Sequence, residues 1–147
     1  MSSTVLPIKI CYVDKDMPKI EKIDIGDWID LRSKVELDYK AGDTLQIPLG
    51  VIIKLPKGSE AIVAPRSSTF KKYGIIMTNS IGIIDNSYCG PGDEWNFLAY
   101  ALKDGHINKY DRICQFRVLP SMGNTFITEI NEPEGETRGG IGSTGVQ

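Results

Sequence analysis

Two segments of the sequence could bind the phosphate groups of a ligand. Pro65-Arg66-Ser67-Ser68 precedes an expected helix, whose N-terminus would offer unpaired N–H groups and the positive end of a dipole. In the segment 138–145 (RGGIGSTG), glycines would let backbone N–H groups approach phosphate oxygens, and Arg138 adds a forked cation. It is not a Walker A loop, because no Lys follows a glycine at the required spacing. Taken alone, the first segment is more often just a helix cap, and the second could be a disordered tail.

A third segment, 82–90 (GIIDNSYCG), carries a carboxylate at the end of an apolar run. Asp85 could act as a general base for a bound water, and Tyr88, three residues later, could form a flat platform for a substrate. The plainer interpretation is a β-turn, which Asp, Asn and Ser favour without any function.

Short strands must position these segments. Alternating hydrophobicity and recurring Pro and Gly residues predict strands at 8–12, 45–55, 60–64, 75–78, 95–102, 113–119 and 126–130. One helix is expected, with capping hydroxyls at Ser67 and Ser68, and it ends at Gly74. We therefore expect one all-β, jelly-roll-like domain over residues 1–147 with one short helix. Residues 131–147 are polar and glycine-rich, which predicts a flexible C-terminal arm.

Composition excludes several classes of function. A net charge of −2 argues against direct nucleic-acid binding, and no apolar run is long enough to span a membrane. The start of the chain lacks the features of a signal peptide. The cysteines at 11, 89 and 114 are too few and too scattered for a disulfide framework, so a cytoplasmic location is the default. His106 is the only histidine and is expected to be a solvated loop residue beside Gly105.

Five segments in order make these weak signals specific. The chain shows 28–32 (WIDLR), 65–68 (PRSS), 82–90 (GIIDNSYCG), 111–115 (DRICQ) and 138–145 (RGGIGSTG). The series resembles the five motifs of the trimeric all-β dUTPase family over residues 26–145, most closely its Bacillus and bacteriophage branch. The resemblance implies a jelly-roll-like β-clip fold and a homotrimer whose sites combine motifs from three subunits.

The resemblance also implies an activity. A dUTPase hydrolyses dUTP to dUMP and pyrophosphate by water attack at the α-phosphorus, assisted by Mg²⁺. This limits uracil incorporation into DNA and supplies dUMP for dTMP synthesis. Asp85 would activate the water, and Tyr88 would pack under the deoxyribose and leave no room for a 2′-hydroxyl group. The uracil edge would be read by a hairpin whose implied contact residues are Asn79, Gly82, Ile83 and Ile84.

The remaining implied contacts are to the phosphates and the metal. The phosphate-binding residues would be Arg66, Ser67, Ser68, Gln115, Arg138, Gly142, Ser143 and Thr144. Asp30 would support Mg²⁺ through water, which agrees with the reluctance of Mg²⁺ to lose its hydration shell. For Arg112 we favour a structural ion pair over substrate contact.

The sequence departs from the family at the base-stacking position. Ile141 stands among the implied substrate contacts where many relatives have Phe, and Ile offers no π-face to uracil. Trp95 could substitute, but its place in an alternating strand is equally typical of a core residue. Cys114 stands where Ala is common and is expected to be small, buried and without a redox role.

Two other functions stay open. A dCTP deaminase would share the fold, but it needs a Glu in the expected strand 95–102, which has none. If the gene is phage-encoded, a regulatory protein partner is also conceivable.

Overall fold

The computed structural model describes residues 5–142, which form short strands and one short helix. In chain order the elements are β1 (Lys9–Tyr12), β2 (Ile29–Arg32), β3 (Leu37–Tyr39), β4 (Thr44–Pro48), β5 (Val51–Lys54), β6 (Ser59–Pro65), α1 (Thr69–Tyr73), β7 (Ile75–Met77), β8 (Gly82–Ile84), β9 (Asn96–Ala101), β10 (Gly105–Ile107) and β11 (Arg112–Pro120). The prediction of an all-β fold with one short helix is confirmed.

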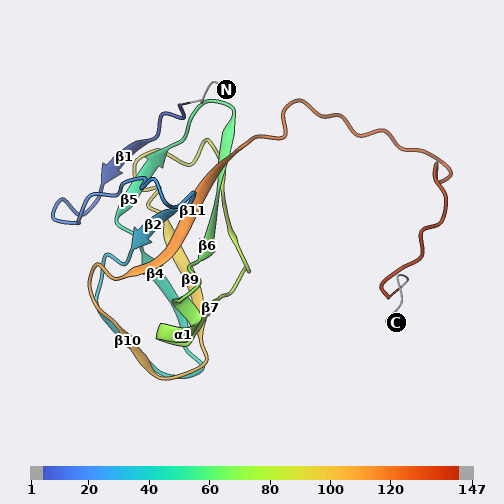
Figure 1. The fold of residues 1–147 in the computed structure, drawn as a ribbon. Helices are drawn as coiled ribbons and strands as arrows, with labels where there is room; N and C mark the ends of the chain where they lie inside the picture. Colours follow the sequence, from blue (N-terminus) through green and yellow to red (C-terminus); the bar gives the residue numbers. More distant parts are fainter. Residues whose placement is uncertain (1–4, 143–147) are drawn as a thin grey trace.

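Two sheets form most of the body. One has the strand order β2-β11-β6-β8 and the other β4-β9-β7, while β1 pairs with β5 and β10 with β3. Every pairing is antiparallel. The long strands β6 and β11 run side by side through the body in Figure 1. Because β8 lies at the end of its sheet order, its outer edge faces away from β6.

Side chains from both larger sheets meet in one core. Phe116 of β11 and Phe97 of β9 are completely buried, and Trp95, just before β9, is 1% exposed. The Trp95 and Phe116 rings meet edge-on at 5.2 Å between centroids, which joins the two sheets. Burying an aromatic side chain of this kind contributes roughly 1.5–3 kcal/mol, so the core fixes how the sheets pack.

The helix α1 ends as predicted but begins differently. Gly74 follows it with φ 64°, a left-handed conformation that glycine adopts without steric cost. Ser68 makes no side-chain capping bond. The buried Thr69 hydroxyl instead accepts from the Arg66 N–H at 2.8 Å and donates to the Ile113 carbonyl at 2.8 Å. The predicted capping hydroxyls were therefore wrong, and Thr69 ties the 66–68 loop to β11.

The predicted strand 45–55 is two strands. β4 and β5 are separated by a turn at Gly50, which has φ 72°. The positive φ strains any residue with a Cβ atom, and a Cβ at Gly50 would also lie 2.7 Å from Met17 Cε, so the turn favours glycine. An apolar run spanning such a turn resembles one continuous strand.

The predicted strand 126–130 does not form. Phe126 is 89% exposed and Ile127 is 95% exposed. Both belong to residues 121–142, the C-terminal arm, which contains no helix or strand and runs away from the body in Figure 1. These residues have strand-like composition, but within residues 5–142 no strand pairs with them. The arm is longer than the predicted 131–147 segment.

His106 was also predicted wrongly as a loop residue. It lies in β10, where its Nδ1 is 2.6 Å from Asp38 Oδ1 and its Nε2 is 2.9 Å from Glu36 Oε2. The strand β10 has three residues, Gly105–Ile107, and their sequence gives only a weak alternating pattern. Among residues 5–142 there is no helix long and apolar enough to cross a membrane.

Candidate active site

An open groove of about 440 Å³ lies between β8 and the strands β4 and β9. Asp85 and Tyr88, from the loop after β8, line it together with Ile83 and Ile84. Gln46 and Asn96 line it from β4 and β9, positions that no local sequence signal connects with Asp85. The groove brings the predicted base and the predicted sugar platform together.

A tight turn orients the Asp85 carboxylate. Oδ2 accepts the Ser87 N–H at 2.9 Å and also the Ser87 hydroxyl. The next residue, Asn86, anchors the turn by donating to the carbonyls of Pro56 at 2.8 Å and Ser59 at 2.9 Å. The Ser87 hydroxyl, followed by its N–H, lowers the pKa of Asp85 below the ordinary value of 3.8. The carboxylate is therefore ionised at neutral pH and suited to accept a proton.

Tyr88 lies beside Asp85 and keeps part of its ring exposed. Its N–H donates to the Asp85 carbonyl at 3.1 Å, and its hydroxyl donates to the Glu94 carbonyl at 3.2 Å. The backbone and the hydroxyl of Tyr88 are thus both held, while the residue stays 39% exposed. A flat ring held this way can support the face of a sugar.

The strand β8 presents backbone groups at the groove. Among residues 5–142, strand β8 pairs only with β6, so the N–H and C=O groups on its other edge face no other strand of this part of the chain and could bind a ligand. A Cβ atom at Gly82 would lie 3.2 Å from Val63 Cβ, which explains a glycine where the two strands pack closely. Asn79 is exposed in the turn before β8. Asn79, Gly82, Ile83 and Ile84 therefore lie in one short segment, but β7 pairs with β9 and β8 with β6, so this segment is not the predicted hairpin.

A second polar cluster joins β2, the end of β6 and β11. Asp30 Oδ1 lies 3.1 Å from Arg66 Nε, and Asp30 Oδ2 lies 3.8 Å from Arg112 Nη1. Gln115 is opposite Asp30 in the β2–β11 register and donates its side-chain amide to the Pro65 carbonyl at 3.0 Å. The ion pair expected of Arg112 is thus present, with Asp30.

This cluster carries more positive than negative charge. Burial and then the nearby charge of Arg112 lower the pKa of Arg32, while Asp30 opposes that shift. Arg66 and Arg112 are bridged as well, since Arg66 Nη1 donates to the Arg112 carbonyl at 3.3 Å. Such a concentration of guanidinium groups suits an anionic ligand.

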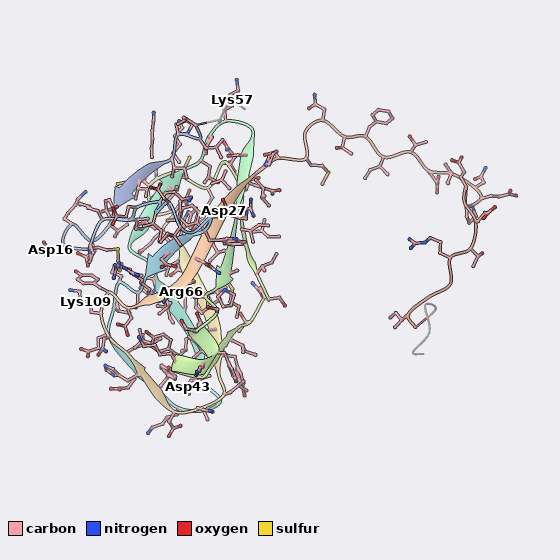
Figure 2. All side chains as sticks on the ribbon, viewed as in Figure 1. Asp16, Asp27, Asp43, Lys57, Arg66 and Lys109 are labelled. Atoms are coloured by element: carbon pink, nitrogen blue, oxygen red, sulfur yellow. The ribbon has the colours of Figure 1, made fainter. Side chains whose placement is uncertain are left out.

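The groove and the cluster lie at opposite ends of β6. Ile84 pairs with Ala61, so Asp85 continues towards the start of β6, whereas Arg66 follows its end. The six residue steps between these positions correspond to roughly 20 Å along an extended strand. In Figure 2, Lys57 marks the end of the body where Asn86 is anchored, and Arg66 lies well away from it. One chain therefore does not bring Asp85 to Arg66 and Gln115.

The last motif lies in the C-terminal arm. Arg138, Ile141 and Gly142 are exposed there, and Ser143 and Thr144 lie outside the described residues. Gly142 has φ 85°, a conformation that favours glycine. The 18 steps from Pro120 to Arg138 could extend to about 60 Å, which is enough to reach another molecule.

Trp95 belongs to the core. Its 1% exposure and its contact with Phe116 leave no ring face for a base, and its Nε1 has no hydrogen-bond partner among the described residues. The structure thus favours the core interpretation over uracil stacking. Cys114 is completely buried, and burial raises the pKa of its thiol, as expected of a residue without a redox role.

Comparisons with known proteins agree with these features. A model of the dUTPase family matches residues 28–145. The SPbeta prophage-derived deoxyuridine 5'-triphosphate nucleotidohydrolase of Bacillus subtilis (strain 168) is 48% identical over 142 residues, which cover 97% of this chain and 100% of the relative.

Two solved phage enzymes share the fold. A mutant dUTPase of Staphylococcus bacteriophage 80alpha with dUpNHpp has a TM-score of 0.79 at 17% identity, covering 95% of this chain and 99% of that one. A mutant dUTPase from phage phi11 of S. aureus, described with a structural Mg(II) ion, has a TM-score of 0.73 at 14% identity, covering 86% and 97%. The ordered motifs, the jelly-roll-like fold and these matches show that the chain belongs to the dUTPase family, in agreement with its predicted Bacillus and bacteriophage affinity.

Proposed function

We propose that this protein hydrolyses dUTP to dUMP and pyrophosphate. The observation that carries the proposal is the groove in which an ionised Asp85 and the Tyr88 ring lie beside a free strand edge. The 48% identity to a deoxyuridine triphosphate nucleotidohydrolase supports the choice of substrate.

In the proposed reaction, a water oxygen attacks the α-phosphorus while Asp85 accepts a proton from that water molecule. The bond between the α-phosphorus and the oxygen bridging to the β-phosphorus breaks, and pyrophosphate leaves with that oxygen. Ser87 holds Oδ2, so Oδ1 is the oxygen available to the water. Positioning and charge neutralisation, rather than covalent catalysis, supply most of the acceleration in phosphoryl transfer.

Specificity would come from the groove walls. The Tyr88 ring supports the deoxyribose and clashes with a ribose 2′-hydroxyl, while Asn79 and the free edge of β8 bind the uracil. A site discriminates most strongly when the wrong substrate clashes or leaves buried polar groups unpaired.

The phosphates would be bound by neighbouring subunits of a homotrimer. A site that combines Asp85 of one chain with Arg66, Ser67, Ser68 and Gln115 of another removes the roughly 20 Å separation seen within one chain. A third chain would contribute Arg138 and the rest of the last motif through the C-terminal arm.

The residues present fit a Mg²⁺ ion held mainly by substrate and water. Within residues 5–142 no group of three His, Cys, Asp or Glu could hold a metal ion by itself. Asp30 is already paired with Arg66 and Arg112, which leaves it to support the ion through water rather than by direct ligation. When bound, Mg²⁺ would neutralise the triphosphate charge and polarise its oxygens.

A panel of nucleotides tests the proposal. Pyrophosphate release should occur with dUTP and Mg²⁺, and only weakly with UTP, dCTP or dTTP or when Mg²⁺ is removed. Equal rates with dUTP and UTP would contradict the role given to Tyr88. In the cell the reaction would take place in the cytoplasm, limit uracil in DNA and supply dUMP.

Deamination of dCTP has less support. The strand β9 contains no Glu, and the nearest one, Glu94, is held by the Lys34 ammonium at 3.0 Å and the Gly50 N–H at 2.9 Å. Uracil nucleotides formed from dCTP would revive this alternative. A regulatory protein partner is tested by a pull-down with and without a non-hydrolysable dUTP analogue, and the idea fails if neither retains a partner.

A further inference from the structure

Glu94 lies on the wall of the groove and has no part in the proposed reaction. Its Oε2 is 3.0 Å from Lys34 Nζ and accepts the Gly50 N–H at 2.9 Å, and its Oε1 accepts from Lys34 Nζ at 3.1 Å. The side chains of Lys34 and Glu94 are only 27% and 20% exposed. This ion pair is therefore partly withdrawn from water, where removing one partner costs more than at an open surface.

The backbone carbonyl of Glu94 holds the sugar platform. It accepts the Tyr88 hydroxyl at 3.2 Å and the Asn96 side-chain amide at 3.0 Å. A shift of Glu94 therefore moves the acceptor to which the outer end of the Tyr88 ring is attached.

The support behind Glu94 is rigid. Gly50 is buried in the turn between β4 and β5, and Lys34 donates its N–H to the Pro48 carbonyl at 2.8 Å in the same region. On either side of Gly50, Leu49 donates to the Trp95 carbonyl and Trp95 donates to the Val51 carbonyl, both at 2.9 Å. The Lys34–Glu94 pair thus connects the groove wall to the β4–β5 turn.

We propose that the Lys34–Glu94 ion pair is a specificity-determining support, which fixes the Tyr88 ring close enough to the sugar to exclude a 2′-hydroxyl group. The inference rests on the proposed function, because it assigns Tyr88 to sugar discrimination. Lys34 and Glu94 are positioning residues, since they act through Tyr88 and touch no reacting atom.

The test compares the kcat/KM for dUTP with that for UTP. Lys34→Met and Glu94→Gln should each lower this ratio by roughly threefold to tenfold, the size of a typical coupling between contacting residues, and leave kcat for dUTP nearly unchanged. In Glu94→Gln, the amide oxygen can still accept the Gly50 N–H, so the contact with the β4–β5 turn is kept. Tyr88→Phe, which keeps the ring and removes only its tether, should lower the ratio similarly.

A double-mutant cycle separates this role from general stability. Because both changes release the same ring, Lys34→Met combined with Tyr88→Phe should lower the ratio no further than either alone. Lys34→Arg, which keeps the positive charge, should retain most of the wild-type ratio of kcat/KM for dUTP to kcat/KM for UTP. Lys40→Met is the matched control, since it removes an ion pair with Asp104 remote from the groove and should not change the ratio.

Two results would overturn the inference. One is an unchanged ratio in Lys34→Met and Glu94→Gln, and the other is a strictly additive double mutant. Failure of the wild-type protein to prefer dUTP would be a different outcome, because it rejects the proposed function before the ion pair is tested.

Discussion

The groove around Asp85 and the arginine cluster around Asp30 are built in opposite ways. The key groove residues come from one stretch, in which Ser87 holds the carboxylate two residues before it. The cluster joins Asp30, Arg66 and Gln115 from three distant segments through strand register. The base and the cationic groups lie at opposite ends of β6, which is the reason for proposing that each chain contributes to different sites.

The largest expected effect tests the groove. Asp85→Asn keeps the shape of the side chain but removes its basicity, so turnover of dUTP should fall by roughly 10²–10⁴-fold, the usual contribution of a general base. Binding should persist. Pyrophosphate release and a fluorescence titration with dUTP measure the two effects, and a variant with wild-type turnover would remove Asp85 from the mechanism.

The second test asks whether the two regions cooperate across subunits. Arg66→Ala and Asp85→Asn should each be poorly active alone. Unfolded and refolded together, they should regain up to roughly a quarter of wild-type activity, because some mixed trimers then contain sites with both residues intact. Each variant refolded alone is the control. No recovery in verified mixed trimers would mean that both residues must come from one chain.

A smaller effect concerns the pH dependence. Because Ser87 lowers the pKa of Asp85, kcat/KM should fall only when the solution becomes acidic enough to protonate that carboxylate. Ser87→Ala removes the hydroxyl donor, so the pKa should rise towards 3.8 and the acid limb should move to higher pH. A pH profile measures this, with Ser87→Thr as the variant that keeps the hydroxyl. An unmoved limb would show that Ser87 does not control the base.

The smallest expected effect concerns His106, which lies outside both the groove and the arginine cluster. Asp38, followed by Glu36, raises the pKa of His106 above 6.5. The stabilisation from protonated His106 should therefore be fully present below 6.5 and disappear as the pH rises through the raised value. His106→Asn should lower the melting temperature slightly near pH 6 and much less near pH 9, without changing dUTP turnover at neutral pH. Equal losses at both pH values would contradict a charge-based role.

Features that depend on local chemistry could be predicted from the sequence. The turn at Asp85 follows from local chemistry, because the Asp85 carboxylate accepts the N–H of Ser87 two residues later. The end of α1 follows from Gly74, because a helix often ends at a residue with a left-handed conformation, which glycine adopts most easily. This choice depends only on residues next to each other in the chain. The five ordered motifs likewise require no knowledge of the fold, and they identified the family.

Tertiary structure decided what depends on distant partners. Trp95 could stack on a base or fill the core until Phe116 was placed against it. The strand expected at 45–55 divides at Gly50, where Leu49 and Val51 on either side both bond the backbone of Trp95. Residues 126–130 have the composition of a strand, but a strand also needs a partner to bind its backbone groups. The separation of Asp85 from Arg66 could be known only from the register of β8 against β6. The sequence of a strand determines which residues share a face, but not which residue of the neighbouring strand lies opposite.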